Sequence, residues 1–347
     1  MKKIGIIPIA MVIVLVLLSF SHFAVASSPQ KQIVLKTVLP FGRDWTSNDM
    51  FLRWVNLVDT LSGGKVKIKV IGGTEVIPTF GLPAALKKGS IDLFYWPMGY
   101  AETITPAARV AQVMYVPPRE NRKAGVHALI DKALRDAQGM TTLGQVQAGG
   151  FFCYFARKPV RSLAGLKGLK MRSGAPLTGP PEKALGIRTV SIPAVEAADA
   201  LNRGVIDGLS FSSYIGYEQG GFPEVVPYRV GPGFCDTSCW IFMMANKYDA
   251  LPADVKELLV DITKQVEFTT WLYYRHYNTE TERRLVKAGK HHVVKWSDAD
   301  NKAFMDVLWR ENIKWVQAKV PAKYSSRILE IWKKYRDKMP EIMPYQN

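Results

Sequence analysis

The chain has 347 residues, of which 48% are hydrophobic and 22% are charged, and these proportions are ordinary for a globular protein. Its formal net charge of +16 favours an anionic partner. The basic residues are interspersed with acids along 256–284 and 314–338, so they indicate a solvated surface and not an arm that binds nucleic acid.

The first 26 residues are typical of a secretory signal peptide. Lys2 and Lys3 form a positive start, Gly5–Phe20 is an uncharged apolar run, and residues 24–26 fit a cleavage site. The alternative is an uncleaved membrane anchor, because the run approaches the length that spans a bilayer. Small residues follow the run and no basic cluster does, which favours cleavage after about Ala26. We therefore expect a periplasmic protein.

A strand, a helix and a second strand follow. Residues 33–38 alternate and are β-branched, which predicts a strand. Residues 49–61 place apolar side chains on one helical face, and Gly63 and Gly64 end that helix. Residues 66–70 predict another strand. This order is the unit of a parallel sheet.

Two short segments, 115 residues apart, repeat one pattern. Ala85–Asp92 and Ala200–Asp207 each read as a helix end, a capping glycine and the start of a strand. Around the second copy we predict a strand over 188–192, a helix over 194–202 and a strand over 205–211. The repeat favours two similar α/β lobes. The alternative is chance similarity, since a helix end followed by a glycine and a strand is a common sequence pattern.

Long helices are predicted in the last third of the chain. One begins at Leu251-Pro252 and continues to about Lys287, long enough to span two lobes as a brace. Two more are expected over 298–318 and 325–338.

The cysteines are too few for a disulfide scaffold. Cys235 and Cys239 could form a disulfide if residues 236–238 make a turn, which leaves Cys153 as a buried thiol. Without that turn the pair stays reduced, and both possibilities remain open from the sequence.

Several short motifs, in this order, resemble the DctP-type solute-binding proteins of TRAP transporters. The first three motifs are a strand that ends in an arginine, a Leu-Gly turn and a helix–strand unit, and they follow one another along the chain. Two further motifs are a Ser-Gly-Gly turn and an Asn…Leu-Pro sequence at the start of the long helix. These motifs are Gly165–Arg172, Ala184–Gly186, Glu196 with Ala200–Gly208, Leu61–Lys65, and Asn246–Pro252. The resemblance covers essentially the whole mature chain.

The resemblance implies an α/β, two-lobed, periplasmic-binding-protein-like fold with a hinge, a central cleft and long lobe-spanning helices. We expect the first lobe over 27–149, with roughly 235–270 returning to it. The second lobe is expected over 150–234, with roughly 271–347 as helices that brace and complete it. The implied function is capture of a small organic acid outside the inner membrane and delivery to the membrane subunits of a TRAP permease. We expect a monomer that is not an enzyme and needs no metal or other cofactor.

Arg172 is the residue that the resemblance assigns to the ligand carboxylate. A guanidinium matches a carboxylate with two parallel hydrogen bonds. Some relatives carry a second arginine, and Phe152 stands at that position here. Where relatives have an asparagine or a metal-binding carboxylate, this chain has Phe211 and Ser210, so neither a sialic-acid site nor a metal-bridged site is supported.

The remaining candidate site residues are mostly aromatic. Taken together they favour a monocarboxylate with an apolar or aromatic body, although each aromatic could equally belong to the core. Glu75 could hold a hydroxyl or amine of the ligand, or be a solvated loop residue. The aromatic candidates are Phe152, Tyr154 and Phe211 from the second lobe and Trp45, Tyr95 and Trp96 from the first.

Two rival functions remain open from the sequence. One is an exported α/β enzyme that acts on a small organic acid, but no nucleophile elbow, P-loop, dinucleotide fingerprint or zinc-protease motif is present. His291 and His292 are adjacent, so a strand would point them to opposite faces and make them poor joint metal ligands. The other is a ligand-sensing subunit of a signalling system, which would share the same fold.

Overall fold

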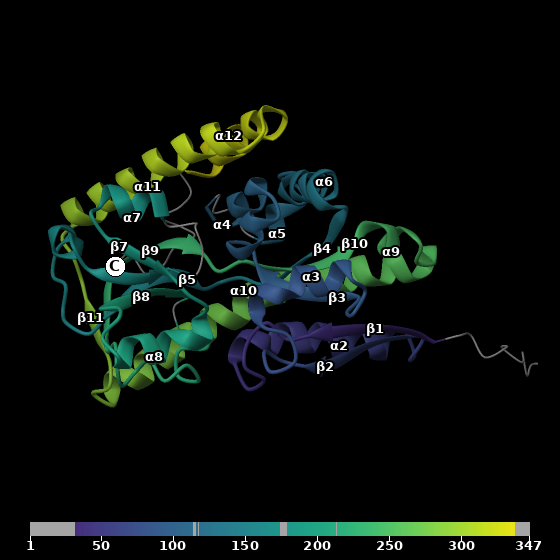
Figure 1. Cartoon of the computed structure of the whole chain (residues 1–347), viewed down its shortest axis with the longest axis horizontal. Helices are drawn as coiled ribbons and strands as arrows, with labels where there is room; N and C mark the ends of the chain where they lie inside the picture. The colour runs from purple at the N-terminus through teal and green to yellow at the C-terminus, as the bar shows by residue number, and fades with distance from the viewer. Residues whose placement is uncertain (1–31, 114–115, 117, 174–178, 213, 337–347) are drawn as a thin grey trace, which may run out of the picture.

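The computed structural model describes residues 32–113, 116, 118–173, 179–212 and 214–336 in two α/β lobes (Figure 1). The predicted signal peptide and cleavage site lie outside these residues. Within them, no helix combines the length and the apolar character that a membrane span requires.

The first lobe contains strands β1–β4 and β10. Strand β1 (Ile33–Val38) pairs in parallel with β2 (Val66–Gly72), and helix α2 (Asp49–Leu61) connects them. Strand β10 (Cys239–Met244) lies between β3 (Leu93–Pro97) and β4 (Met140–Gln147), antiparallel to both. The predicted strand–helix–strand unit is therefore confirmed. Helices α3 (Leu82–Lys87), α6 (Val126–Gln138) and α9 (Ala245–Asp249) complete this part, with the short helices α4 (Val110–Val113) and α5 (Pro118–Asn121).

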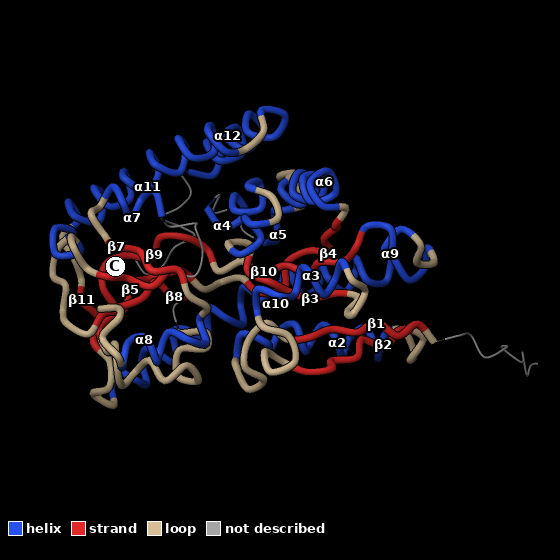
Figure 2. Tube along the Cα trace, viewed as in Figure 1, coloured by secondary structure: helices blue, strands red, loops and turns tan. Residues whose placement is uncertain are grey.

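The second lobe contains a mixed sheet of six strands in the order β11-β9-β5-β8-β6-β7 (Figure 2). Strands β6 and β7 and strands β6 and β8 run parallel, whereas β5 is antiparallel to both β8 and β9. Helices α7 and α8 belong to this lobe. The bounds are β5 (Phe151–Ala156), β6 (Lys170–Ser173), α7 (Gly179–Ala184), β7 (Arg188–Ser191), α8 (Ala197–Asn202), β8 (Gly208–Ser212), β9 (Tyr228–Asp236) and β11 (His292–Val294).

The repeated sequence pattern corresponds to the same local structure in both lobes. Asp92 accepts a hydrogen bond from the backbone N–H of Lys36 at 2.8 Å and donates its own N–H to the Lys36 carbonyl. Asp207 makes the same two contacts with Lys170. In each lobe the aspartate thus joins the start of one strand, β3 or β8, to a residue of a neighbouring strand, β1 or β6, which explains why the pattern recurs.

The lobes are joined by two strand crossings and by helix α10 (Ala253–Lys287). The β4–β5 crossing passes through Gly149 and Gly150, and Thr237 in the β9–β10 crossing donates its N–H to the Gly150 carbonyl at 2.7 Å. Gly149 has a φ of +88°, and a Cβ atom there would lie 2.4 Å from the Trp271 carbonyl oxygen on α10. The crossing strands therefore lie directly against the helix that spans both lobes, as predicted for residues 251–287.

Helices α11 (Asp298–Lys319) and α12 (Ala322–Arg336) form a layer along one edge of the molecule (Figure 1). Helix α11 packs on α7 of the second lobe, whereas α12 packs on α6 of the first. Lys323 and Tyr324 of α12 both contact Asp136 of α6. This pair of helices thus connects the lobes on the side away from the β1–β2 strands.

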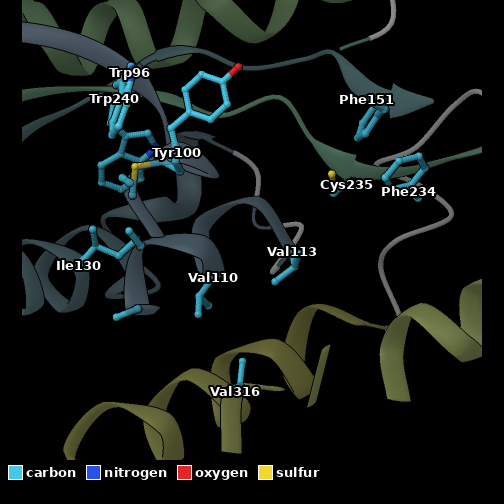
Figure 3. Close-up of a cluster of buried hydrophobic side chains, with 14 of the residues drawn as sticks. Trp96, Tyr100, Val110, Val113, Ile130, Phe151, Phe234, Cys235, Trp240 and Val316 are labelled. Carbon is cyan, nitrogen blue, oxygen red and sulfur yellow. The ribbon is translucent and has the colours of Figure 1, made fainter. Parts of the chain in front are cut away.

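The core is aromatic and continues from one lobe into the other (Figure 3). Cys235 and Cys239 are both buried and form no disulfide with each other, so the possible bridge is absent. His291 is buried and His292 is exposed, as expected for neighbours that point to opposite sides.

Candidate functional site

A cavity with about 580 Å³ of space between its lining atoms, part of it open to solvent, lies between the lobes. Residues of both lobes and of the crossing after β9 line it. The first lobe contributes Phe41, Trp45, Ser47, Pro97, Gly99, Tyr100, Gln112, Gln147 and Cys239; the second contributes Phe152, Arg172, Ser173, Ala194, Ser210, Phe211 and Ser212; the crossing contributes Thr237 and Ser238.

Arg172 is the one positively charged side chain among the described residues that line this cavity. It lies in β6, and its side chain is almost completely buried. Three of its five N–H donors have partners: Nε donates to the Ile192 carbonyl at 2.9 Å, one terminal nitrogen to the Ser210 carbonyl at 3.2 Å, and the other to the Tyr100 hydroxyl at 3.2 Å. Strands β7 and β8 therefore fix the guanidinium from both sides.

The guanidinium of Arg172 forms no ion pair with any carboxylate of the described residues. Its partners are two carbonyls and one phenol. Each terminal nitrogen retains one N–H donor without a described partner. A buried charge without an opposite charge is costly, so the arrangement favours an anion that presents two oxygens side by side.

Two further polar side chains reach the cavity with unused hydrogen-bonding capacity. The Oε1 atom of Gln112 and the Oγ1 atom of Thr237 are buried and have no hydrogen-bond partner among the residues that the structure describes. An amide can present either its oxygen or its nitrogen after a flip, and a hydroxyl can donate or accept. These groups can therefore bind a second polar atom of a ligand.

The remaining walls are largely apolar. Phe41 and Trp45 stack with ring centroids 5.8 Å apart, and Trp45 meets Phe211 edge to face at 6.4 Å. Phe152 lies on β5 beside this group in the cavity lining. Apolar walls with a few placed polar groups are typical of sites for small molecules.

The structure brings four of the predicted site residues together. Arg172, Phe152, Phe211 and Trp45 all line the cavity, from both lobes. Their contact with a ligand stays a prediction, but their common location agrees with the sequence analysis.

Tyr95, Trp96 and Tyr154, which the sequence analysis placed at the site, lie outside the described lining of this cavity. Tyr95 and Trp96 are neighbours on β3, so they point to opposite faces and cannot both face one cavity. The Tyr95 hydroxyl bonds to Asn48 and the Ser47 carbonyl, while Trp96 packs in the core. Tyr154 stacks on Phe234, and its hydroxyl donates to Glu182 at 3.2 Å.

Glu75 also lies outside the cavity. Its carboxylate accepts a hydrogen bond from its neighbour Gly73 and pairs with Arg43 at 2.7 Å on the surface. These contacts, the backbone bond to Gly73 first, lower the pKa of Glu75 to about 2. The alternative of a solvated loop residue therefore describes it better.

The sequence analysis missed Tyr100, Gln112 and Phe41. Tyr100 and Gln112 belong to the short helical segments between β3 and α6, where no motif indicates which side chain faces inward. Phe41 precedes Trp45 by four residues in the loop after β1. That spacing was the one feature of the sequence that could have placed Phe41 beside a predicted site residue.

A monocarboxylate 2-oxoacid-binding periplasmic protein of Nostoc sp. is 25% identical over 249 residues, which cover 67% of this chain and 65% of that relative, just under two thirds of its length. A TRAP periplasmic solute-binding protein from Desulfovibrio salexigens, with bound orotic acid, superposes with a TM-score of 0.79 at 15% identity over 89% of this chain and 100% of that one.

A second solved structure agrees with this fold. A TRAP periplasmic solute-binding protein from Desulfovibrio desulfuricans, with bound sn-glycerol-3-phosphate, gives a TM-score of 0.78 at 20% identity over 87% of this chain and 97% of that one. The model of bacterial extracellular solute-binding protein family 7, DctP, matches residues 43–314. The chain therefore belongs to the DctP family of bacterial extracellular solute-binding proteins.

Proposed function

We propose that this protein captures a small monocarboxylate with an apolar or aromatic body and delivers it to a TRAP permease in the membrane. The observation that carries the proposal is the buried guanidinium of Arg172, which has no described carboxylate partner and retains two N–H donors. A ligand carboxylate supplies the missing charge and accepts both hydrogen bonds.

The apolar walls support a single charged end on the ligand. Among the described residues that line the cavity, Arg172 is the one positively charged side chain, and Phe152, Phe211 and Trp45 form apolar surface. Burial of a second carboxylate against these rings would be costly. The name of the Nostoc relative, a binder of monocarboxylate 2-oxoacids, is in line with this preference.

Binding without conversion is part of the proposal, as is action in the periplasm as a monomer after cleavage near Ala26. We further propose the lobe boundaries expected from the sequence, with the division at about residues 149–150 and 234–235. Both divisions fall close to the strand crossings that join the two lobes.

A thermal-shift panel tests this function. The panel contains benzoate, phenylacetate and 4-methylpentanoate as monocarboxylates, and malonate and succinate as dicarboxylates. A monocarboxylate at 100 times its Kd should stabilise the folded protein by about 2.7 kcal/mol. The dicarboxylates should give a much smaller shift, and mass spectrometry should recover the bound acid unchanged.

Arg172→Ala locates the site in the same assay. The variant should lose the ligand-dependent shift, because it removes the cation that the carboxylate requires. A wild-type protein that responds to no acid, or a variant that responds like the wild type, would overturn the proposal.

A further inference from the structure

Phe80 is a half-exposed aromatic residue outside the ligand cavity. It lies in the turn Thr79–Gly81 of the first lobe, and 46% of its surface is in contact with solvent. Its ring meets Tyr100 edge to face at 4.9 Å and Trp96 at 6.0 Å, and those two rings are 5.4 Å apart. The three rings thus form one cluster that leads from the surface to the cavity wall.

Tyr100 is the member of this cluster that reaches the proposed site. Figure 3 shows its ring beside Trp96, with the hydroxyl directed away from that tryptophan. The hydroxyl accepts a hydrogen bond from Arg172 at 3.2 Å. Tyr100 belongs to the first lobe and Arg172 to the second, so this contact exists only while the lobes are close together.

The turn that carries Phe80 is fixed from its other side. The Thr79 hydroxyl, which is buried, donates to the Pro40 carbonyl at 2.9 Å, directly before the cavity residue Phe41. Gly81 closes the turn by donating to the Pro78 carbonyl. The Phe80 ring is therefore held on a short anchored segment, and it limits how far the Tyr100 ring can move outward.

We propose that Phe80 is a positioning residue for ligand capture: it holds Tyr100 where its hydroxyl meets Arg172 when the lobes close. This inference rests on the proposed function, since it concerns the same guanidinium. Phe80 is not among the described residues that line the cavity, so it acts on the site through the ring cluster with Trp96 that ends at Tyr100. Its loss leaves the cavity intact but weakens the closed, ligand-holding state.

The inference predicts a kinetic effect, because the contact between lobes forms after the ligand has entered. Phe80→Ala should speed ligand dissociation, and raise Kd, by about twofold to tenfold, the range that the loss of one aromatic pair implies. The association rate should change little. Phe80→Tyr keeps the ring and should restore wild-type dissociation.

The experiment measures stopped-flow kinetics with whichever of benzoate, phenylacetate and 4-methylpentanoate binds the wild type most tightly. Phe80→Ala, Tyr100→Phe and the double variant are compared, because a positioning role through the hydroxyl predicts that Phe80→Ala adds nothing once the hydroxyl is gone. Phe268→Ala is the matched control: it removes a phenylalanine that is 55% exposed on α10.

The outcomes separate this inference from the proposed function. If no acid of the panel binds the wild type, the proposed function fails. If the acid binds and Arg172→Ala abolishes binding, the function stands, and the inference is overturned when Phe80→Ala dissociates at the wild-type rate. It is also overturned when the effects of Phe80→Ala and Tyr100→Phe are additive, or when Phe268→Ala speeds dissociation equally.

Discussion

At the scale of single residues, the site depends on a cation that the fold has buried in advance. The carbonyls of Ile192 and Ser210 hold Arg172 without neutralising it. The positive charge of the guanidinium is thus held in place, but no negatively charged side chain of the described residues neutralises it. A bound anion would neutralise it. This preorganisation lowers the entropic cost of binding, because the guanidinium does not have to find its geometry.

The Arg172→Lys variant separates the contribution of the positive charge from that of the planar guanidinium shape. Lysine keeps the positive charge but lacks the planar fork, so one of two charge-assisted hydrogen bonds to the ligand is lost. We expect Kd for the best-binding acid to rise roughly tenfold to hundredfold. Isothermal titration calorimetry measures the change, with Arg161→Lys as a control at an exposed arginine of the same lobe. Equal affinity of Arg172→Lys and the wild type would show that the fork plays no part.

The sequence could indicate Arg172 because a recognisable motif precedes it, and the family resemblance could indicate apolar walls because it placed Phe152 and Phe211 near that arginine. It could not indicate Tyr100 or Gln112. Their position depends on how short helices between β3 and α6 pack, and no periodicity marks the inward face of a single turn. Tyr95 and Trp96 are neighbours on β3, so their side chains point to opposite faces and cannot both face one cavity.

At the scale of elements, the regular segments were predicted well. The strand at 33–38 and the helix at 49–61 have the predicted bounds, since strong periodicity and a glycine stop define them. The strand predicted from Val205 begins only at Gly208. Val205 still donates its N–H to Ala200 as part of the helix end, and this contact delays the strand.

Substitution of Gly149 by alanine tests the close contact between the β4–β5 crossing and helix α10. An alanine there would adopt a left-handed conformation and place its Cβ atom against the Trp271 backbone. Gly168→Ala is the control, because Gly168 has a φ of +84° but nothing within 4 Å of the added atom. Both variants carry the conformational cost, about 1–2 kcal/mol.

Only Gly149→Ala also carries the steric cost. We expect urea unfolding to show an additional loss of about 1–3 kcal/mol in its free energy of unfolding relative to Gly168→Ala. Equal losses would mean that the crossing strand can move away from the helix without penalty, and that the lobes are less firmly joined there.

In the whole molecule, two strand crossings, helix α10 and the α11–α12 pair connect the two α/β lobes. Figure 1 shows α10 passing along both lobes, while α11 and α12 close the opposite edge. The sequence repeat indicated the paired lobes. It could not indicate that α12 packs on α6 of the first lobe, because the contact of Tyr324 with Asp136 joins residues 188 positions apart.

We expect a monocarboxylate to bind between the lobes with its carboxylate on Arg172. A crystal structure of the protein with the best-binding acid of the panel tests it most directly. We predict both carboxylate oxygens within about 2.7–3.2 Å of the Arg172 terminal nitrogens, and the apolar part of the acid between Trp45, Phe152 and Phe211. A ligand whose carboxylate lies on another residue, or outside this cavity, would contradict the account.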